Sequence, residues 1–167
     1  PGNPYQPEES DSAMDQLGFR MKFGVLGPST NTIVQPDLDD MRPVGVTNHY
    51  SRIEVPNMAV NSDADFLRLV DIILDNTMTA ADALKSCAMQ YLVMGMSATT
   101  FWNGRAGAES YRKLMQERSS VAVSCGSFAT EAALNAVKAK RIAFLSPYFP
   151  SANSQVRRFY EDCGFTV

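Results

Sequence analysis

The chain has 167 residues, of which 45% are hydrophobic and 20% are charged. This composition is typical of a folded globular protein and excludes disorder over most of the chain. The formal net charge of −3 argues against nucleic acid as a partner. No apolar stretch approaches the roughly 20 residues of a membrane-spanning helix, and the N-terminus shows no signal-peptide pattern, so we expect no membrane association.

Cysteine and histidine are scarce. Cys87, Cys125 and Cys163 are an odd number, too few for a disulfide scaffold, and their spacing fits no compact zinc motif. His49 is the only histidine, which disfavours a histidine-based metal site. The sequence therefore predicts a reduced, cytoplasmic compartment and no bound metal.

Residues 1–20 are predicted to form a disordered or extended acidic arm. Four acidic residues precede Arg20, and three of the nine prolines lie in this stretch. A segment of this composition cannot bury a core of its own. The remainder of the chain is close to neutral.

The elements that follow alternate between strands and helices. Short runs of apolar and β-branched residues predict strands at 21–26, 43–53, 91–96, 121–125 and 141–145, with another beginning at 165. Helical spacing predicts helices from Asp63, then over 79–88, 107–118, 127–139 and 151–163, with Thr79 capping the second and Gly164 ending the last.

This alternation indicates an α/β fold with three layers around a parallel sheet. The continuous apolar run at 91–96 predicts a strand buried on both faces. Because the chain stops only three residues into the final predicted strand, we expect it to be the front portion of a longer protein. The alternative is a natural chain that ends in a short edge strand.

Ligands of open parallel sheets bind at the carboxyl ends of the strands. Four segments follow predicted strands at that edge: 27–32, 95–104, 124–127 and 146–148. In the first, Ser29 and Asn31 can help to hold an anion, although an ordinary polar turn is the simpler interpretation of the local sequence. In the second, Ser97 offers a hydroxyl beside Gly95, although a helix cap is the alternative.

Two further side chains at this edge could carry chemistry. Tyr148 can donate a hydrogen bond to a bound carboxylate. Cys125 opens a predicted helix, where a thiol can become reactive, but no base is evident and a buried structural cysteine is the simpler interpretation. His49 and Arg52 lie on opposite faces of their strand, and we expect structural roles for both.

Four motifs resemble one enzyme family. They are Gly-Pro-Ser-Thr-Asn-Thr at 27–32, Met-Gly-Met-Ser-Ala-Thr-Thr at 94–100, Ser-Phe-Ala-Thr-Glu-Ala-Ala-Leu at 127–134 and Lys-Arg-Ile-Ala-Phe-Leu-Ser-Pro-Tyr at 140–148. Together they are similar to the aspartate/glutamate racemase superfamily, most of all to its maleate cis-trans isomerase and arylmalonate decarboxylase branch. The likeness covers residues 21–167.

The resemblance implies two similar α/β domains related by a pseudo-twofold axis, with the site between them and no metal or organic cofactor. Here the first domain would span 21–104, and an incomplete second domain 105–167. The resemblance also implies a homo-oligomer. Asn31, with Ser29 beside it, matches the position that binds one substrate carboxylate. Ser97 and Tyr148 match the donors that hold a second carboxylate or an enediolate.

The resemblance also indicates which reaction to expect. The first catalytic cysteine of the isomerases and racemases falls at Gly95, where the decarboxylases also have glycine, and the second would fall beyond Val167. We expect a cofactor-independent decarboxylase-like or isomerase-like enzyme acting on a small carboxylic or dicarboxylic acid through an enediolate. One alternative is a maleate isomerase or racemase with a displaced nucleophile, for example Cys125. Another is a non-catalytic carboxylate-binding protein.

Overall fold

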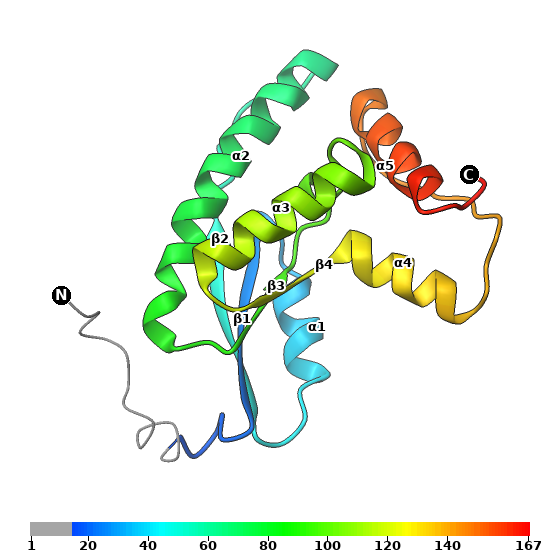
Figure 1. Ribbon diagram of the computed structural model, residues 1–167. Helices are drawn as coiled ribbons and strands as arrows, with labels where there is room; N and C mark the ends of the chain where they lie inside the picture. Colours follow the sequence, from blue (N-terminus) through cyan, green and yellow to red (C-terminus); the bar gives the residue numbers. More distant parts are fainter. Residues whose placement is uncertain (1–14) are drawn as a thin grey trace.

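The computed structural model describes residues 15–167 and places four parallel strands at the centre of the fold (Figure 1). The strands are β1 (Met21–Pro28), β2 (Val46–Ile53), β3 (Tyr91–Met94) and β4 (Ala122–Cys125), in the order β2-β1-β3-β4. β1 pairs with both β2 and β3, and β3 pairs with β4, each time in parallel register. The predicted parallel sheet is therefore confirmed.

Helices cover both faces of this sheet. They are α1 (Val34–Asp40), α2 (Asp63–Ala83), α3 (Gly104–Ser119), α4 (Gly126–Ala136) and α5 (Pro150–Asp162), with short 3-10 turns η2 (Lys85–Cys87) and η3 (Ala98–Phe101). α2 and α3 lie on one face, whereas α1 lies on the other (Figure 1). The three-layer arrangement predicted from the sequence is confirmed.

The main core lies between the sheet and the α2–α3 layer. Leu26 of β1 and Leu92 of β3 are completely buried there, against Ile73 of α2 and Met115 of α3. Burying a leucine side chain stabilises a fold by about 1.5–3 kcal/mol. In β3, however, burial alternates, and Tyr91 and Val93 are only half-buried. The second face of β3 is therefore covered less completely than the sequence predicted, because α1, the helix on that side, has only seven residues and leaves these two side chains partly open.

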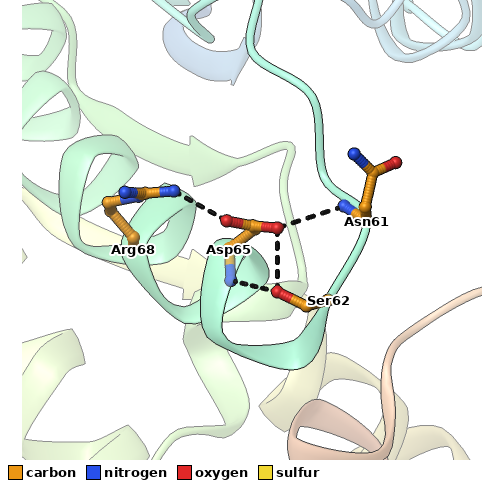
Figure 2. A network of polar contacts seen from close by, with 4 residues as sticks. All are labelled: Asn61, Ser62, Asp65 and Arg68. Atoms are coloured by element: carbon orange, nitrogen blue, oxygen red, sulfur yellow. Dashed lines mark hydrogen bonds and ion pairs between the residues drawn. The ribbon is translucent and has the colours of Figure 1, made fainter.

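The N-terminus of α2 is fixed by a capping network (Figure 2). The Ser62 hydroxyl accepts a hydrogen bond from the Asp65 backbone N–H at 3.1 Å and donates one to the Asp65 carboxylate at 2.8 Å. That carboxylate also accepts from the Asn61 backbone N–H at 3.3 Å and from Arg68 at 2.7 Å. These contacts, the Ser62 hydroxyl foremost, lower the pKa of Asp65 from its usual value. The predicted helix start at Asp63 is confirmed.

Three predicted elements need correction. Thr79 does not cap a second helix but lies inside α2, because the buried stripe of Val70, Ile73, Thr77 and Ala80 runs past it and the helix continues to Ala83. The stretches 141–145 and 165–167 are not strands. They meet in a single parallel bridge between Arg141 and Thr166, and one bridge does not make a ladder.

Several boundaries also differ from the expectation. α1 was not predicted, since its sequence holds Pro36 and three aspartates, but Pro36 lies in the first turn, where a proline is tolerated. β4 pairs with β3 in the same sheet, and the predicted division into two domains after residue 104 stays a prediction. Most of the predicted acidic arm, residues 1–14, lies outside the described residues. Arg20, at its end, donates its backbone N–H to the Gly45 carbonyl at 2.8 Å.

A second, aromatic cluster joins α5 to the rest of the fold. Phe159 of α5 is completely buried and packs edge-on against Phe101, Phe128 and Tyr160, with ring centroids 5.3 to 5.6 Å apart. Phe101 belongs to η3 and Phe128 to α4, so a single ring connects three elements. Gly164 follows α5 with a φ of +87°, a conformation that favours glycine and ends the helix as predicted.

The Phe159→Ala substitution should lower the free energy of unfolding by about 3–5 kcal/mol, because it leaves a cavity in the aromatic cluster. Urea denaturation followed by circular dichroism measures the change. Val137→Ala is the matched control, since Val137 is 74% exposed and its truncation should cost less than about 0.5 kcal/mol. Equal losses for the two variants would show that the cluster does not hold α5 in place.

Candidate active site

A hydrogen bond between Ser97 and Tyr148 marks the candidate active site. The two hydroxyl oxygens are 2.8 Å apart, and either can be the donor. Ser97 follows β3 at the carboxyl edge of the sheet, and Tyr148 precedes α5. Ser97 is exposed and Tyr148 half-buried, so the pair is accessible from outside. The sequence predicted that these residues meet, and the structure places them in contact.

The turn after β3 directs Ser97 toward Tyr148. The Gly95 backbone N–H donates to the Leu26 carbonyl at 2.6 Å, which continues the pairing with β1 beyond the end of the strand. The Ser97 carbonyl accepts from the backbone N–H and the hydroxyl of Thr100, at 2.9 and 2.7 Å. The Ser97 side chain makes no capping hydrogen bond to η3. The helix-cap alternative therefore does not account for this hydroxyl.

The N-terminus of α4 lies beside Ser97. A Cβ atom built on Gly126, the first residue of α4, would be 3.6 Å from the Ser97 Cβ. The first backbone N–H groups of a helix have no partner within the helix, and the helix dipole favours negative charge at that end. The Ser97–Tyr148 pair and the start of α4 therefore present neutral donors and partial positive charge to the same region.

The turn after β1 uses the Asn31 and Ser29 side chains differently. The Asn31 side-chain oxygen accepts from the backbone N–H groups of Ile33 and Val34, both at 2.9 Å, at the start of α1. The Ser29 hydroxyl accepts from the Val55 backbone N–H at 2.9 Å. Within residues 15–167, neither side chain hydrogen-bonds to Ser97 or Tyr148. Contact is thus shown for two of the predicted site residues, and the carboxylate-binding role of Asn31 and Ser29 stays a prediction.

Arg52 has a larger part in this turn than the sequence indicated. Its guanidinium donates to the Asn31 carbonyl at 2.6 Å and to the Ser29 carbonyl at 3.3 Å, and it lies over the Tyr50 ring at 5.1 Å. Register places Arg52 opposite Gly27, one residue before β1 ends at Pro28. The pairing of β2 with β1, had it been predicted, would have placed Arg52 near the turn after β1. His49, on the other face of the strand, bonds to the Thr47 hydroxyl at 3.0 Å.

Gly95, where the resemblance implies a cysteine in the isomerases and racemases, is tightly enclosed. A Cβ atom there would lie 2.7 Å from the Leu26 carbonyl oxygen and 2.8 Å from a methyl group of Val34. Real Cβ atoms rarely approach so closely, and the first of these neighbours is backbone. A side chain at this position requires β1 or α1 to move, so the fold favours glycine here.

The cysteines do not suit a nucleophilic role near neutral pH. Cys125 is 1% exposed, and burial raises its pKa to about 11. Burial, with the Glu131 carboxylate nearby, raises the pKa of Cys163 to about 11 as well, and burial also raises the pKa of Cys87. Because the thiolate is the reactive form, these thiols are poor nucleophiles. Cys125 is therefore disfavoured as a displaced nucleophile, and its packing agrees with the structural interpretation.

The described residues show neither a metal-binding cluster nor a membrane-spanning helix. Across residues 15–167, no three His, Cys, Asp or Glu side chains are grouped so that they could hold a metal ion. In the same part of the chain, no helix has the length and apolar character needed to cross a membrane.

Comparison with known protein families identifies the family to which the chain belongs. The family described as arylmalonate decarboxylase matches residues 59–167, which is more than half of the sequence, and the chain therefore belongs to that family. This confirms the resemblance seen in the motifs. No curated protein sequence matches the chain closely enough to count as a relative.

Solved structures share the fold at low sequence identity. Nocardia farcinica maleate cis-trans isomerase bound to TRIS matches with a TM-score of 0.72 and 19% identity, over 88% of this chain and 61% of that one. Pseudomonas putida maleate isomerase with maleate gives 0.64 and 19%, over 88% and 61%. An arylmalonate decarboxylase gives 0.63 and 16%, over 87% and 59%. The chain thus spans about 60% of the length of these structures.

Alkylation tests the assignment of the cysteines. Iodoacetamide at pH 8 should leave Cys125 unmodified in the native protein, because its thiol is buried and its pKa is about 11. Peptide mass spectrometry after a short pulse reads each cysteine separately, and the same pulse in urea is the control in which all three should react. Rapid native labelling of Cys125 would restore it as a candidate nucleophile.

Proposed function

We propose that this protein is a cofactor-independent decarboxylase or isomerase that acts on a small carboxylic or dicarboxylic acid through an enediolate. The observation that carries the proposal is the contact of the Ser97 and Tyr148 hydroxyls beside the N-terminus of α4. Membership of the arylmalonate decarboxylase family supports the same class of reaction.

The chemistry follows from how these donors meet a carboxylate. When a carbon–carbon bond to a departing carboxylate breaks, carbon dioxide leaves and its electron pair stays on the substrate. That charge spreads onto the oxygens of the remaining carboxylate, which gives the enediolate. The carbon that lost carbon dioxide then takes up one proton to give the product acid, and the family resemblance implies that a cysteine beyond Val167 supplies this proton. Hydroxyl and backbone N–H donors fixed beside these oxygens stabilise the charge as it forms, without reorganising. Each hydrogen bond to a charged group is worth about 1.5–3 kcal/mol.

We assign Ser97 and Tyr148 to charge stabilisation and not to proton transfer. Within residues 15–167, none of the three cysteines hydrogen-bonds to the pair. Gly95, which the fold favours over a side chain, supports a decarboxylase-like reaction over a two-cysteine isomerisation. Asn31 and Ser29 remain our proposal for the other substrate carboxylate, which Ser97 and Tyr148 do not hold. Cytoplasmic location and homo-oligomeric assembly remain predictions from the sequence.

An activity screen tests the proposed reaction. The protein expressed from its complete gene is incubated with phenylmalonate, alkylmalonates, maleate, and L-aspartate or L-glutamate. Carbon dioxide release reports decarboxylation, fumarate formation reports isomerisation, and loss of optical rotation reports racemisation. We expect release of carbon dioxide from a malonate. Binding of these acids without turnover would instead support the second candidate, a non-catalytic carboxylate-binding protein, which needs only the same donors.

The Tyr148→Phe substitution should weaken phenylmalonate binding about 10- to 150-fold, because it removes one hydrogen bond to a charged group and leaves the ring in place. Calorimetric titration measures the affinity. Tyr91→Phe is the matched control, since Tyr91 begins β3 at the opposite edge of the sheet and packs against Phe23. If both variants bind like the wild-type protein, Tyr148 does not belong to the site.

A further inference from the structure

A closed set of hydrogen bonds fixes the backbone of Tyr148. The Tyr148 N–H donates to the Ser146 hydroxyl at 3.3 Å, and the Tyr148 carbonyl accepts from the Asn153 side-chain amide at 3.0 Å. The Ser146 hydroxyl in turn donates to the side-chain oxygen of Asn153. Asn153 thus uses both ends of its amide group and closes a ring around Ser146, Pro147 and Tyr148.

The helix that carries Asn153 is itself anchored at its start. The Ser151 N–H, in the first turn of α5, donates to the Asp63 carboxylate at 3.1 Å. Phe149 stacks on Phe66 with ring centroids 5.4 Å apart and an interplanar angle of 27°. Asp63 and Phe66 belong to the first turns of α2, which the network of Figure 2 caps. Asn153 therefore holds the Tyr148 segment against an α5 that is docked on α2.

Packing alone restrains the Tyr148 ring incompletely. Tyr148 is only half-buried, and Pro147, the residue before it, is exposed. The phenol oxygen lies at the far end of the side chain, so a small rotation of the backbone moves it substantially. A displacement of about 1 Å at a reacting group can cost on the order of 100-fold in rate. The hydroxyl therefore needs a fixed backbone if it is to stay on Ser97.

We propose that Asn153 is a positioning residue that sets the Tyr148 hydroxyl on Ser97 through this ring of hydrogen bonds. The inference rests on the proposed function for its catalytic meaning, but the geometric claim is independent of it. Sequence reasoning assigned no role to Asn153, which is the third residue of the helix predicted over 151–163.

The Asn153→Asp variant tests the proposal most selectively. Aspartate keeps an oxygen that can accept from Ser146, but an ionised carboxylate has no N–H to donate to the Tyr148 carbonyl. Asn153→Ala removes both bonds. Ser146→Ala opens the ring from the other side without changing α5. Ser154→Ala is the matched control, because the Ser154 hydroxyl donates at 2.6 Å to the Ser151 carbonyl of its own helix.

Two readouts separate this proposal from the proposed function. In protein carrying ¹³C at the tyrosine ring carbon next to the hydroxyl, the Tyr148→Phe variant identifies the Tyr148 NMR signal among the six tyrosines. The Tyr148 signal should shift in Asn153→Asp, Asn153→Ala and Ser146→Ala, which break the ring of hydrogen bonds. It should stay in place in Ser154→Ala. Phenylmalonate affinity, measured by calorimetry, should fall about fivefold in Asn153→Asp, the loss of one ordinary hydrogen bond.

A Tyr148 signal that does not move in Asn153→Asp, Asn153→Ala or Ser146→Ala would overturn the proposal, whatever happens to binding. A signal that shifts while the wild-type protein fails to bind phenylmalonate would support the positioning role and count against the proposed function. Circular dichroism confirms that each variant is folded before either readout is taken, and Ser146→Ala decides the matter if the Asn153 variants unfold.

Discussion

The hydrogen bond between Ser97 and Tyr148 joins parts of the chain that are 51 residues apart in sequence. One partner extends from the end of a central strand of the sheet, and the other comes from the segment that leads into α5. Everything else in the candidate site is arranged around this contact. The sheet fixes Ser97, because the Gly95 N–H continues the β1–β3 pairing directly before it. α2 and α5 fix the segment that carries Tyr148.

Parallel topology explains why these groups meet at one edge. All four strands run in the same direction, so the turns that follow β1 and β3 and the start of α4 lie at a common end of the sheet. No charged side chain belongs to the Ser97–Tyr148 pair. Its electrostatic contribution comes from hydroxyl dipoles and from the N-terminus of α4, which suits an anion whose charge grows during the reaction.

The sequence predicted the parts of this arrangement that depend on local pattern. Strand periodicity located β1 to β4, and the hydroxyl groups after β3 and before α5 singled out Ser97 and Tyr148. The sequence-based predictions failed where contacts between distant parts of the chain determine the local structure. The run at 141–145 has the composition of a strand, yet only Arg141 finds a partner, in Thr166. Thr79 has the character of a cap, but a continuous buried stripe keeps it inside α2. Asn153 has no sequence signature, because its importance lies in two contacts made across a turn.

The account depends on Ser97 and Tyr148 acting as one unit toward a carboxylate, and a double-mutant cycle measures this directly. Phenylmalonate affinity is determined by calorimetry for the wild-type protein, Ser97→Ala, Tyr148→Phe and the double variant. Because the two hydroxyls are in contact, we expect the double variant to differ from the sum of the single losses by about 0.5–3 kcal/mol. Losses that add to within about 0.5 kcal/mol would show that the two residues act independently and would contradict a shared site.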